Sequence, residues 1–178
     1  MVICATDKLE HREQAYDLLT HGARVCWGWD ALPIVERAPG GKPFFPEFPE
    51  RHFNLSHSGS FALCGLDDAP VGVDIQIVKE NWREGLPKRV CAPAELAWLD
   101  GQSDRWPAFA LLWALKEARG KYEGTGLRPG VREISVPLPR GGERLFRHDG
   151  LWFRIYMGEG WMAAACGEQK PPEELIWV

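Results

Sequence analysis

The sequence predicts an α+β fold, organised as one or at most two compact units. Two segments, 8–28 and 106–123, carry apolar residues at helical spacing. Shorter segments at 61–66, 71–77, 151–156 and 161–166 are rich in apolar residues and are bounded by turn residues, as strands are. A chain of 178 residues is long enough to bury a core between these elements.

Composition and charge argue against several classes of protein. The formal net charge of −4 argues against nucleic acid or an anionic membrane surface as the main partner. No apolar run reaches the length of a membrane span and no signal peptide is visible, so we expect a cytoplasmic protein. The five cysteines are scattered without the paired spacing of metal ligands, and we expect reduced and mostly buried thiols.

The first predicted helix, 8–28, has an apolar face that repeats at the helical period, formed by Ala15, Leu18, Leu19, Gly22 and Ala23. Arg12 lies on the polar face, where a solvated charge is the ordinary interpretation. A loop at 38–52 follows, rich in glycine and proline. Its phenylalanines need to pack against the rest of the protein, so we interpret it as a loop of the domain and not as a linker.

Two strands are expected before the acid-bearing one. The block 53–59 ends one strand and turns into 61–66. The turn at 67–70 then leads into 71–77, which we expect to form a hairpin with 61–66. The run Ser56-His57-Ser58 lacks the G-x-S-x-G turn of serine hydrolases, so we do not expect a hydrolase nucleophile there.

The strand 71–77 carries one acid opposite its aliphatic residues. Val71, Val73, Ile75 and Ile77 form the aliphatic face, and Gly72, Asp74 and Gln76 form the other. An acid in this position is usually on the solvated side of a sheet. Gly72, however, leaves room beside Asp74 for another backbone or for a ligand.

The second predicted helix, 106–123, carries an aromatic residue, an acid and two bases at helical spacing. Trp113, Glu117 and Lys121 are four residues apart on one face, and Lys116 lies beside them. Acid–base pairs at this spacing are common on solvated helices, which they stabilise by only about 0.2–0.5 kcal/mol. The alternative is a helix face that holds a metal ion and a phosphate together. Glycines after residue 123 are expected to end the helix.

Strands predominate in the remainder of the chain. Segments 131–138 and 144–147 are candidate strands, and 151–156 and 161–166 are clearer ones, with hairpin turns at 149–150 and 158–160. We expect these strands to be scaffold, because they carry no acid pair or histidine cluster. The tail from Pro171 is expected to lie on the surface, with Trp177 able to dock.

Several motifs together resemble the 4′-phosphopantetheinyl transferase superfamily. Its paired signature, V-G-[VI]-D followed by W-[STCA]-x-K-E-[AS]-x-x-x-K, fits residues 71–74 and 113–121, with Asp74 and Glu117 43 positions apart. Residues 53–59 (F-N-L-S-H-S-G) and 41–44 (G-K-P-F) match two further blocks of the family, and His11-Arg12 matches a shorter one.

This resemblance implies an Sfp-type fold with a shortened N-terminal half. It would consist of two similar α+β halves, with antiparallel sheets and packed helices. Residues 1–70 would carry the coenzyme A-binding elements, and residues 71–178 the metal and catalytic elements, in one compact unit. Ligands that larger members of the family draw from their longer N-terminal part cannot be assigned here.

The resemblance also implies roles for single residues. Asp74 and Glu117 would bind Mg²⁺, and Glu117 would accept a proton from the attacking serine. Gln76 stands where many members have glutamate, so it would bind the metal weakly or through a water. Lys121, with Lys116 nearby, would stabilise the leaving phosphate. The residues implied to bind coenzyme A are Arg12, Lys42, Pro43, Ser56, His57, Lys116 and Lys121.

The implied function is transfer of 4′-phosphopantetheine from coenzyme A to a serine of an apo acyl or peptidyl carrier protein, with Mg²⁺ and release of 3′,5′-ADP. We expect a monomer that binds no nucleic acid and no membrane. Arg119 or Lys88 could steer an acidic carrier protein, and Glu95 is implied to lie near the metal or a basic partner. The alternatives are a non-catalytic coenzyme A or carrier-protein binding module and a coenzyme A phosphohydrolase. The sequence does not specify whether the carrier serves fatty acid, polyketide or nonribosomal peptide synthesis.

Overall fold

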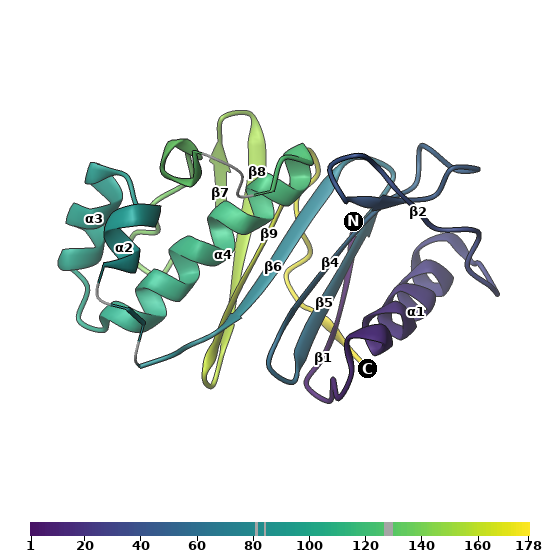
Figure 1. Cartoon of the computed structure of the whole chain (residues 1–178), viewed down its shortest axis with the longest axis horizontal. Coiled ribbons are helices and arrows are strands. Elements are labelled where there is room, and N and C mark those ends of the chain that lie inside the picture. The colour runs from purple at the N-terminus through teal and green to yellow at the C-terminus, as the bar shows by residue number, and fades with distance from the viewer. Residues whose placement is uncertain (81, 84, 127–129) are drawn as a thin grey trace.

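Two four-stranded sheets, each covered by a long helix, form the body of the protein (Figure 1). The computed structural model describes residues 1–80, 82–83, 85–126 and 130–178. The first sheet has the order β10-β1-β5-β4, with β1 (Val2–Thr6), β4 (His52–Ser58), β5 (Phe61–Asp67) and β10 (Ile176–Trp177). The second has the order β6-β9-β8-β7, with β6 (Val71–Ile77), β7 (Leu145–His148), β8 (Leu151–Gly158) and β9 (Trp161–Gly167). Neighbouring strands are antiparallel except for β1 and β10.

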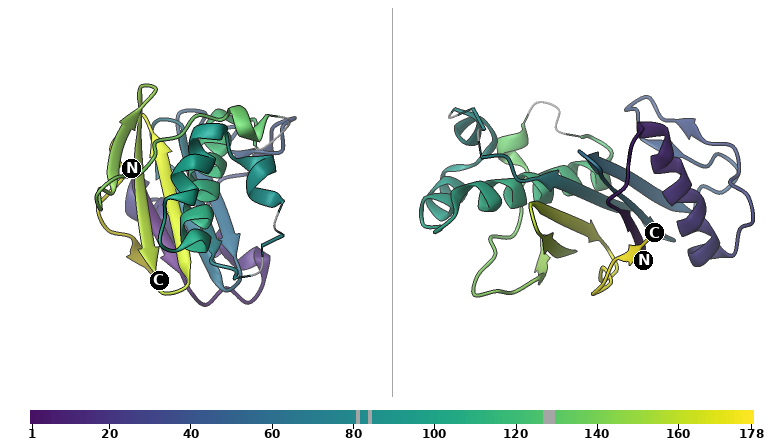
Figure 2. Two further views of the ribbon diagram at one scale, coloured as in Figure 1. Left: turned by 90° about the vertical axis from the view of Figure 1, so that its left-hand side faces the viewer. Right: turned by 90° about the horizontal axis from the view of Figure 1, so that it is seen from below.

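The helices lie at the two ends of the molecule and across the second sheet. Helix α1 (Ala15–Trp27) packs on β1 and β5, and α4 (Arg105–Glu123) packs on β6 and β9. Figure 2 shows α1 at one end of the molecule and the shorter helices at the other. The shorter elements are η1 (Arg12–Gln14), α2 (Leu86–Val90), α3 (Pro93–Asp100), η2 (Val131–Glu133) and the ribbon of β2 (Glu36–Arg37) and β3 (Pro43–Phe44). The α+β fold predicted from the sequence is therefore confirmed.

The second long helix ends at the predicted residue 123, and the first ends at Trp27, one residue before its predicted bound. Gly28 and Gly124 follow the last helical residues with φ of 71° and 75°, a left-handed conformation that glycine adopts without strain. The first helix begins later than expected, because η1 occupies the segment in front of Ala15. The predicted buried face, Ala15 to Ala23 at helical spacing, is buried as expected.

Two strand predictions are wrong. The segment 61–66 forms no hairpin with 71–77, because both edges of β5 are occupied by β1 and β4 and the chain crosses to the other sheet at residues 68–70. The segment 131–138 forms η2 and irregular chain instead of a strand. The carbonyl groups of Val131 and Ile134 accept hydrogen bonds from a buried lysine, so they do not join a ladder.

The two sheets meet along a seam between the edge strands β4 and β6. Across it, backbone N–H groups of β6 donate to side chains of β4 and not to its backbone. Side-chain oxygens of Asn54, Ser56 and Ser58 accept hydrogen bonds from the N–H groups of Val73, Ile75 and Ile77, at 2.9, 3.3 and 3.1 Å. Polar side chains of β4 therefore take the place of a second strand partner for β6, and they bring Ser56 beside the acid of β6.

The two faces of β6 are used as the sequence predicts. Val71, Val73 and Ile75 are buried in the core between the sheets, together with residues of β1 and β9. On the other face, Gly72 lies so close to α4 that an added Cβ would overlap the carbonyl oxygen of Ala118 and come within 2.7 Å of a second backbone atom. The room that Gly72 provides is thus taken by a helix backbone.

The C-terminal tail and the cysteines lie as the sequence analysis predicts. Strand β10 pairs with β1, and Trp177 lies 5.9 Å from the Trp161 ring, so the tail docks through Trp177. Strand β10 lies in the predicted second half, 71–178, but belongs to the first sheet. The division into halves at residue 70 stays a prediction. All five cysteines are free, and only Cys26 is not fully buried. In the part of the chain that is described, no helix is long and apolar enough to cross a membrane.

Candidate active site

A cavity of about 330 Å³ opens at the seam between the two sheets. From the first sheet and its helix it is lined by Arg12, Ala15, Tyr16, Arg37, Pro43, Asn54, Leu55, Ser56 and His57. From β6 and α4 it is lined by Asp74, Gln76, Glu117 and Lys121. The residues that the sequence motifs single out on β4, β6 and α4 therefore meet in one place.

Asp74 is the most tightly held of these residues and is only 2% exposed. Its Oδ1 accepts hydrogen bonds from Ser56 Oγ at 2.6 Å and from Lys121 Nζ at 2.7 Å. Its Oδ2 accepts one from Gln76 Nε2 at 2.7 Å. A buried carboxylate needs such partners, since an unpaired one would be strongly destabilising. The interpretation of Asp74 as the solvated side of a strand is excluded.

Glu117 and Lys121 lie one turn apart on α4 and both line the cavity. Lys121 Nζ also donates to the carbonyl of Val73 at 3.2 Å, which fixes the ammonium group against β6. Burial raises the pKa of Glu117 above its ordinary value, and the negative charge of Asp74 raises it further. Glu117 is therefore a carboxyl group whose negative charge is disfavoured by its surroundings, which favours uptake of a proton or contact with a cation.

The donor set fits Mg²⁺. The residues are two carboxylates, Asp74 and Glu117, and the amide of Gln76, whose NH₂ group donates to Asp74 and leaves its oxygen as a third candidate ligand. No cluster of three or more histidines, cysteines or acids suited to a metal occurs within the described ranges. Mg²⁺ does not need one, because it usually binds one or two carboxylates and keeps several waters or substrate oxygens.

The other wall of the cavity is basic. Arg12 precedes α1, and Arg37 on β2 donates to the Gly41 carbonyl at 3.1 Å with Nη1, while its Nη2 lies 3.5 Å from the Tyr16 hydroxyl. Burial lowers the pKa of His57, and the nearby positive charges of Arg12 and Lys121 lower it further. His57 is thus a neutral hydrogen-bonding group at neutral pH, and two guanidinium groups supply the positive charge that would attract an anionic substrate.

Lys116 is a correction to the sequence-based assignment. Its side chain is 0% exposed and is absent from the cavity lining. Nζ forms an ion pair with Glu95 Oε1 at 2.8 Å and donates to the carbonyls of Val131 and Ile134 at 3.0 and 2.8 Å. These contacts use all three N–H groups of the ammonium. Lys116 therefore cannot reach a phosphate in the cavity, and it is itself the basic partner expected for Glu95.

Lys42 also lies outside the cavity, although the next residue, Pro43, lines it. Lys42 Nζ donates to the carbonyls of Lys121 and Tyr122 at 2.8 and 3.2 Å, at the end of α4. The lysine assigned by resemblance to coenzyme A thus contacts the helix that carries Glu117 and Lys121.

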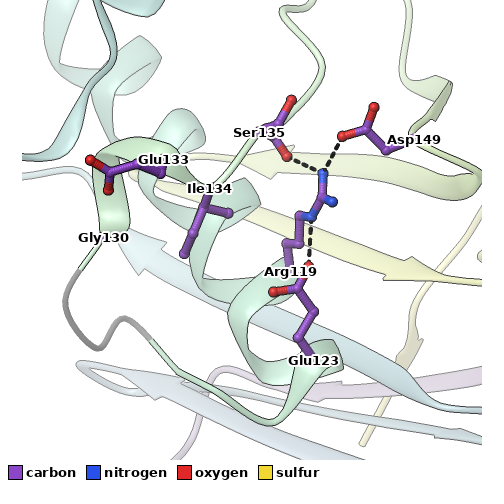
Figure 3. A pocket seen from close by; sticks show the side chains of 7 residues that line it. All are labelled: Arg119, Glu123, Gly130, Glu133, Ile134, Ser135 and Asp149. Carbon is purple, nitrogen blue, oxygen red and sulfur yellow. Dashed lines mark hydrogen bonds and ion pairs between the residues drawn. The ribbon is translucent and has the colours of Figure 1, made fainter.

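Arg119, one of two residues expected to steer a carrier protein, has its charge neutralised within the chain. Figure 3 shows its guanidinium between Glu123 and Asp149, at 2.9 and 2.8 Å, at the edge of a second cavity of about 740 Å³. The side chain is 16% exposed. Lys88 on α2 is exposed, so of the two it is the one placed to meet a partner.

The structure adds cavity residues that the sequence reasoning missed, among them Tyr16, Arg37 and Asn54. Tyr16 follows Arg12 by one helical turn, and this spacing was a usable signal. Asn54 lies within the recognised block 53–59. Nothing in the sequence around Arg37 indicates that it lines the cavity, because its position depends on the turn at Gly41.

Comparison with known proteins identifies relatives over most of the chain. Residues 70–166 match the family model described as the 4′-phosphopantetheinyl transferase superfamily. A 4′-phosphopantetheinyl transferase of Bacillus subtilis is 33% identical over 187 positions, which cover 93% of this chain and 82% of the relative. The 4′-phosphopantetheinyl transferase Sfp of Bacillus subtilis (strain 168) is 33% identical over 149 positions, which cover 78% of this chain and 65% of Sfp.

A eukaryotic relative is similar over a comparable span. The L-aminoadipate-semialdehyde dehydrogenase-phosphopantetheinyl transferase of Eremothecium gossypii is 31% identical over 179 positions, covering 89% of this chain and 65% of the relative. The chain thus spans about two thirds of the length of Sfp and of this relative.

Proposed function

Because the chain belongs to the 4′-phosphopantetheinyl transferase superfamily, we propose that it transfers 4′-phosphopantetheine from coenzyme A to a serine hydroxyl of an apo acyl or peptidyl carrier protein. One observation carries the proposal. Asp74, Glu117 and Lys121 meet at the acidic end of a single cavity, and Arg12, Arg37 and His57 line the same cavity. An acidic pocket beside a basic wall suits a pyrophosphate ester that is bound together with a cation.

The chemistry is phosphoryl transfer. The serine oxygen attacks the phosphorus that bears pantetheine, the bond from this phosphorus to the bridging oxygen breaks, and 3′,5′-ADP leaves. The raised pKa of Glu117 suits it to take the proton of the serine, directly or through a water. Mg²⁺, held by Asp74 and Glu117 with Gln76 as a weak or water-mediated ligand, would neutralise charge on the pyrophosphate when bound.

The remaining residues bind and orient. Lys121 Nζ, fixed by Asp74 and Val73, is available to the leaving phosphate on its exposed side. Arg12 and Arg37 present guanidinium groups, which match phosphate oxygens in a bidentate manner. His57 contributes a neutral ring N–H as a donor. We expect Ser56 to act mainly on Asp74, because its hydroxyl hydrogen is used there.

Intact-mass spectrometry tests the proposal. Apo carrier proteins from fatty acid, polyketide and nonribosomal peptide systems are incubated with the protein, coenzyme A and Mg²⁺. We expect a gain of one phosphopantetheine on at least one carrier, lost with Glu117→Ala and kept with Glu123→Gln, which changes an acid of the same helix outside the cavity.

The other outcomes select the alternatives. Coenzyme A binding without a mass gain on any carrier would favour the non-catalytic binding module, and release of phosphopantetheine without an acceptor would favour a phosphohydrolase. Dependence on Mg²⁺ is read by adding a chelator. The monomeric state and the cytoplasmic location stay predictions, the first to be checked by light scattering.

A further inference from the structure

Lys42 joins the first half of the chain to the end of the catalytic helix. It lies directly after Gly41, which has a φ of 85°, and directly before Pro43, the first residue of β3 in the β2–β3 ribbon. The turn is closed by hydrogen bonds from Ala38 N to the Lys42 carbonyl at 2.9 Å and from Gly41 N to the Ala38 carbonyl at 2.7 Å. The backbone from which the Lys42 side chain starts is therefore well fixed.

The side chain ends at the C-terminus of α4. Nζ donates to the carbonyls of Lys121 and Tyr122, at 2.8 and 3.2 Å. The last carbonyls of a helix lack partners within the helix and carry the negative end of its dipole, so an ammonium group there is doubly favourable. The packing is close, since a Cβ added to Gly124 would lie 3.9 Å from Lys42 Cδ. Burial lowers the pKa of Lys42, as expected for an ammonium group withdrawn from water.

Both the backbone and the side chain of Lys121 are held by hydrogen bonds. Its backbone carbonyl accepts the bond from Lys42, and its ammonium group binds Asp74 Oδ1 at 2.7 Å. The position of the last turn of α4 determines whether the Lys121 side chain reaches Asp74 and the cavity. Gly40 also lies against this end of the helix, since a Cβ added to it would be 3.1 Å from the Gly124 carbonyl oxygen.

We infer that Lys42 is a positioning residue that acts through Lys121 and does not bind the coenzyme. By fixing the last turn of α4, it places the Lys121 ammonium between Asp74 and the leaving phosphate. This inference rests on the proposed function for its kinetic consequence, but its structural part can be tested without any activity.

The structural test is competitive labelling of Lys121 with an acylating reagent, read by peptide mass spectrometry. Lys42→Met is expected to make Lys121 about tenfold more reactive, because loss of its ion pair frees the amine. Lys42→Arg, which can still donate to the two carbonyls, should keep the protection, and Lys170→Met, which changes an exposed lysine whose ammonium lies over the Trp152 ring, should not change it. Circular dichroism confirms that each variant is folded. Unchanged labelling of Lys121 in folded Lys42→Met would overturn the inference, whether or not the protein is a transferase.

The kinetic test is a double-mutant cycle with Lys121→Met. We expect Lys42→Met to lower kcat/KM for carrier modification about ten- to a hundredfold, the range for a misplaced catalytic group. In the Lys121→Met background the same change should cost less than about twofold, because residues that act through one another are not additive. If Lys42→Met lowers kcat/KM by the same factor in wild type and in Lys121→Met, Lys42 does not act through Lys121 and contacts the coenzyme itself. If wild-type protein modifies no carrier, the proposed function fails, and the labelling result alone decides the role of Lys42.

Discussion

Replacing Lys116 by methionine should remove one partner of a fully buried ion pair. Lys116 is 0% and Glu95 5% exposed, and their charged atoms are 2.8 Å apart. Removing one member of such a pair leaves an uncompensated charge and costs about 3–5 kcal/mol. A change of 1 kcal/mol moves the melting temperature of a domain of this size by about 2–4 °C, so we expect Tm to fall by about 6–20 °C.

A second variant separates the cost of leaving the Glu95 charge unpaired from the cost of losing the other hydrogen bonds of Lys116. Glu95 Oε2 accepts a hydrogen bond from Ala92 N at 2.6 Å, which a glutamine oxygen can also accept. Lys116→Met with Glu95→Gln should therefore be more stable than Lys116→Met alone, by about 1–3 kcal/mol, the cost of a buried unsatisfied group. The remaining loss reports the bonds to Val131 and Ile134.

The assay is urea unfolding followed by circular dichroism, with the slope of the transition compared between variants. Lys88→Met, an exposed lysine on α2, is the control and should stay within about 0.5 kcal/mol of wild type. A loss of less than about 1 kcal/mol for Lys116→Met would refute the buried pair. A large loss of coenzyme A affinity in a variant of unchanged stability would instead restore Lys116 as a ligand.

Three further changes test the site. Gly72→Ala should destabilise the fold by about 1–3 kcal/mol in urea unfolding, since its Cβ would meet the α4 backbone, whereas Gly85→Ala, with open space around it, should be neutral. The pKa of Glu117 is raised in the folded state, so its ionisation destabilises the fold as pH rises through that pKa. Glu117→Gln should thus be more stable than wild type in metal-free buffer at neutral pH, and the gain should vanish in acid; a pH-independent difference would contradict this. Arg37→Gln should weaken coenzyme A binding about ten- to a hundredfold in calorimetry, as for a lost charge-assisted hydrogen bond, while Arg24→Gln, outside the cavity, should not.

The sequence was sufficient for the acidic part of the site. Strand and helix periods decide which residues of 71–77 and 106–123 share a face, and the structure brings Asp74, Glu117 and Lys121 together accordingly. Gly72 indicated a close approach at β6, and the approaching group is α4. These inferences succeeded because they depend on local geometry.

For Lys116, the family motif and the helical period predict different positions. It lies one turn after the buried Leu112, whereas Glu117 and Lys121 continue the face of Trp113. The period alone therefore places Lys116 toward the core, where a lysine needs an acid such as Glu95. The family motif joins Lys116 to Glu117 in sequence, but adjacent residues on a helix point about 100° apart.

The position of Arg37 and the pairing of β6 with β9 instead of β5 could not be derived, because both depend on contacts between distant segments. A two-residue strand has no readable period, and nothing local to Arg37 indicates that the Gly41 turn directs it toward α1. A short turn between two apolar strands predicts a hairpin, and only the occupancy of both β5 edges excludes it.

The seam explains why the site lies between the sheets. Edge N–H groups of β6 need acceptors, and β4 supplies them from side chains, so polar residues are required wherever the two strands meet. The Ser56 hydroxyl accepts from Ile75 N and donates its single hydrogen to Asp74. One side chain thus joins the sheets and orients the acid. It follows that the orientation of Asp74 is coupled to the docking of the two sheets, since an opening of the seam at Ser56 also removes one of the three side-chain hydrogen bonds that hold the carboxylate, leaving those from Lys121 and Gln76.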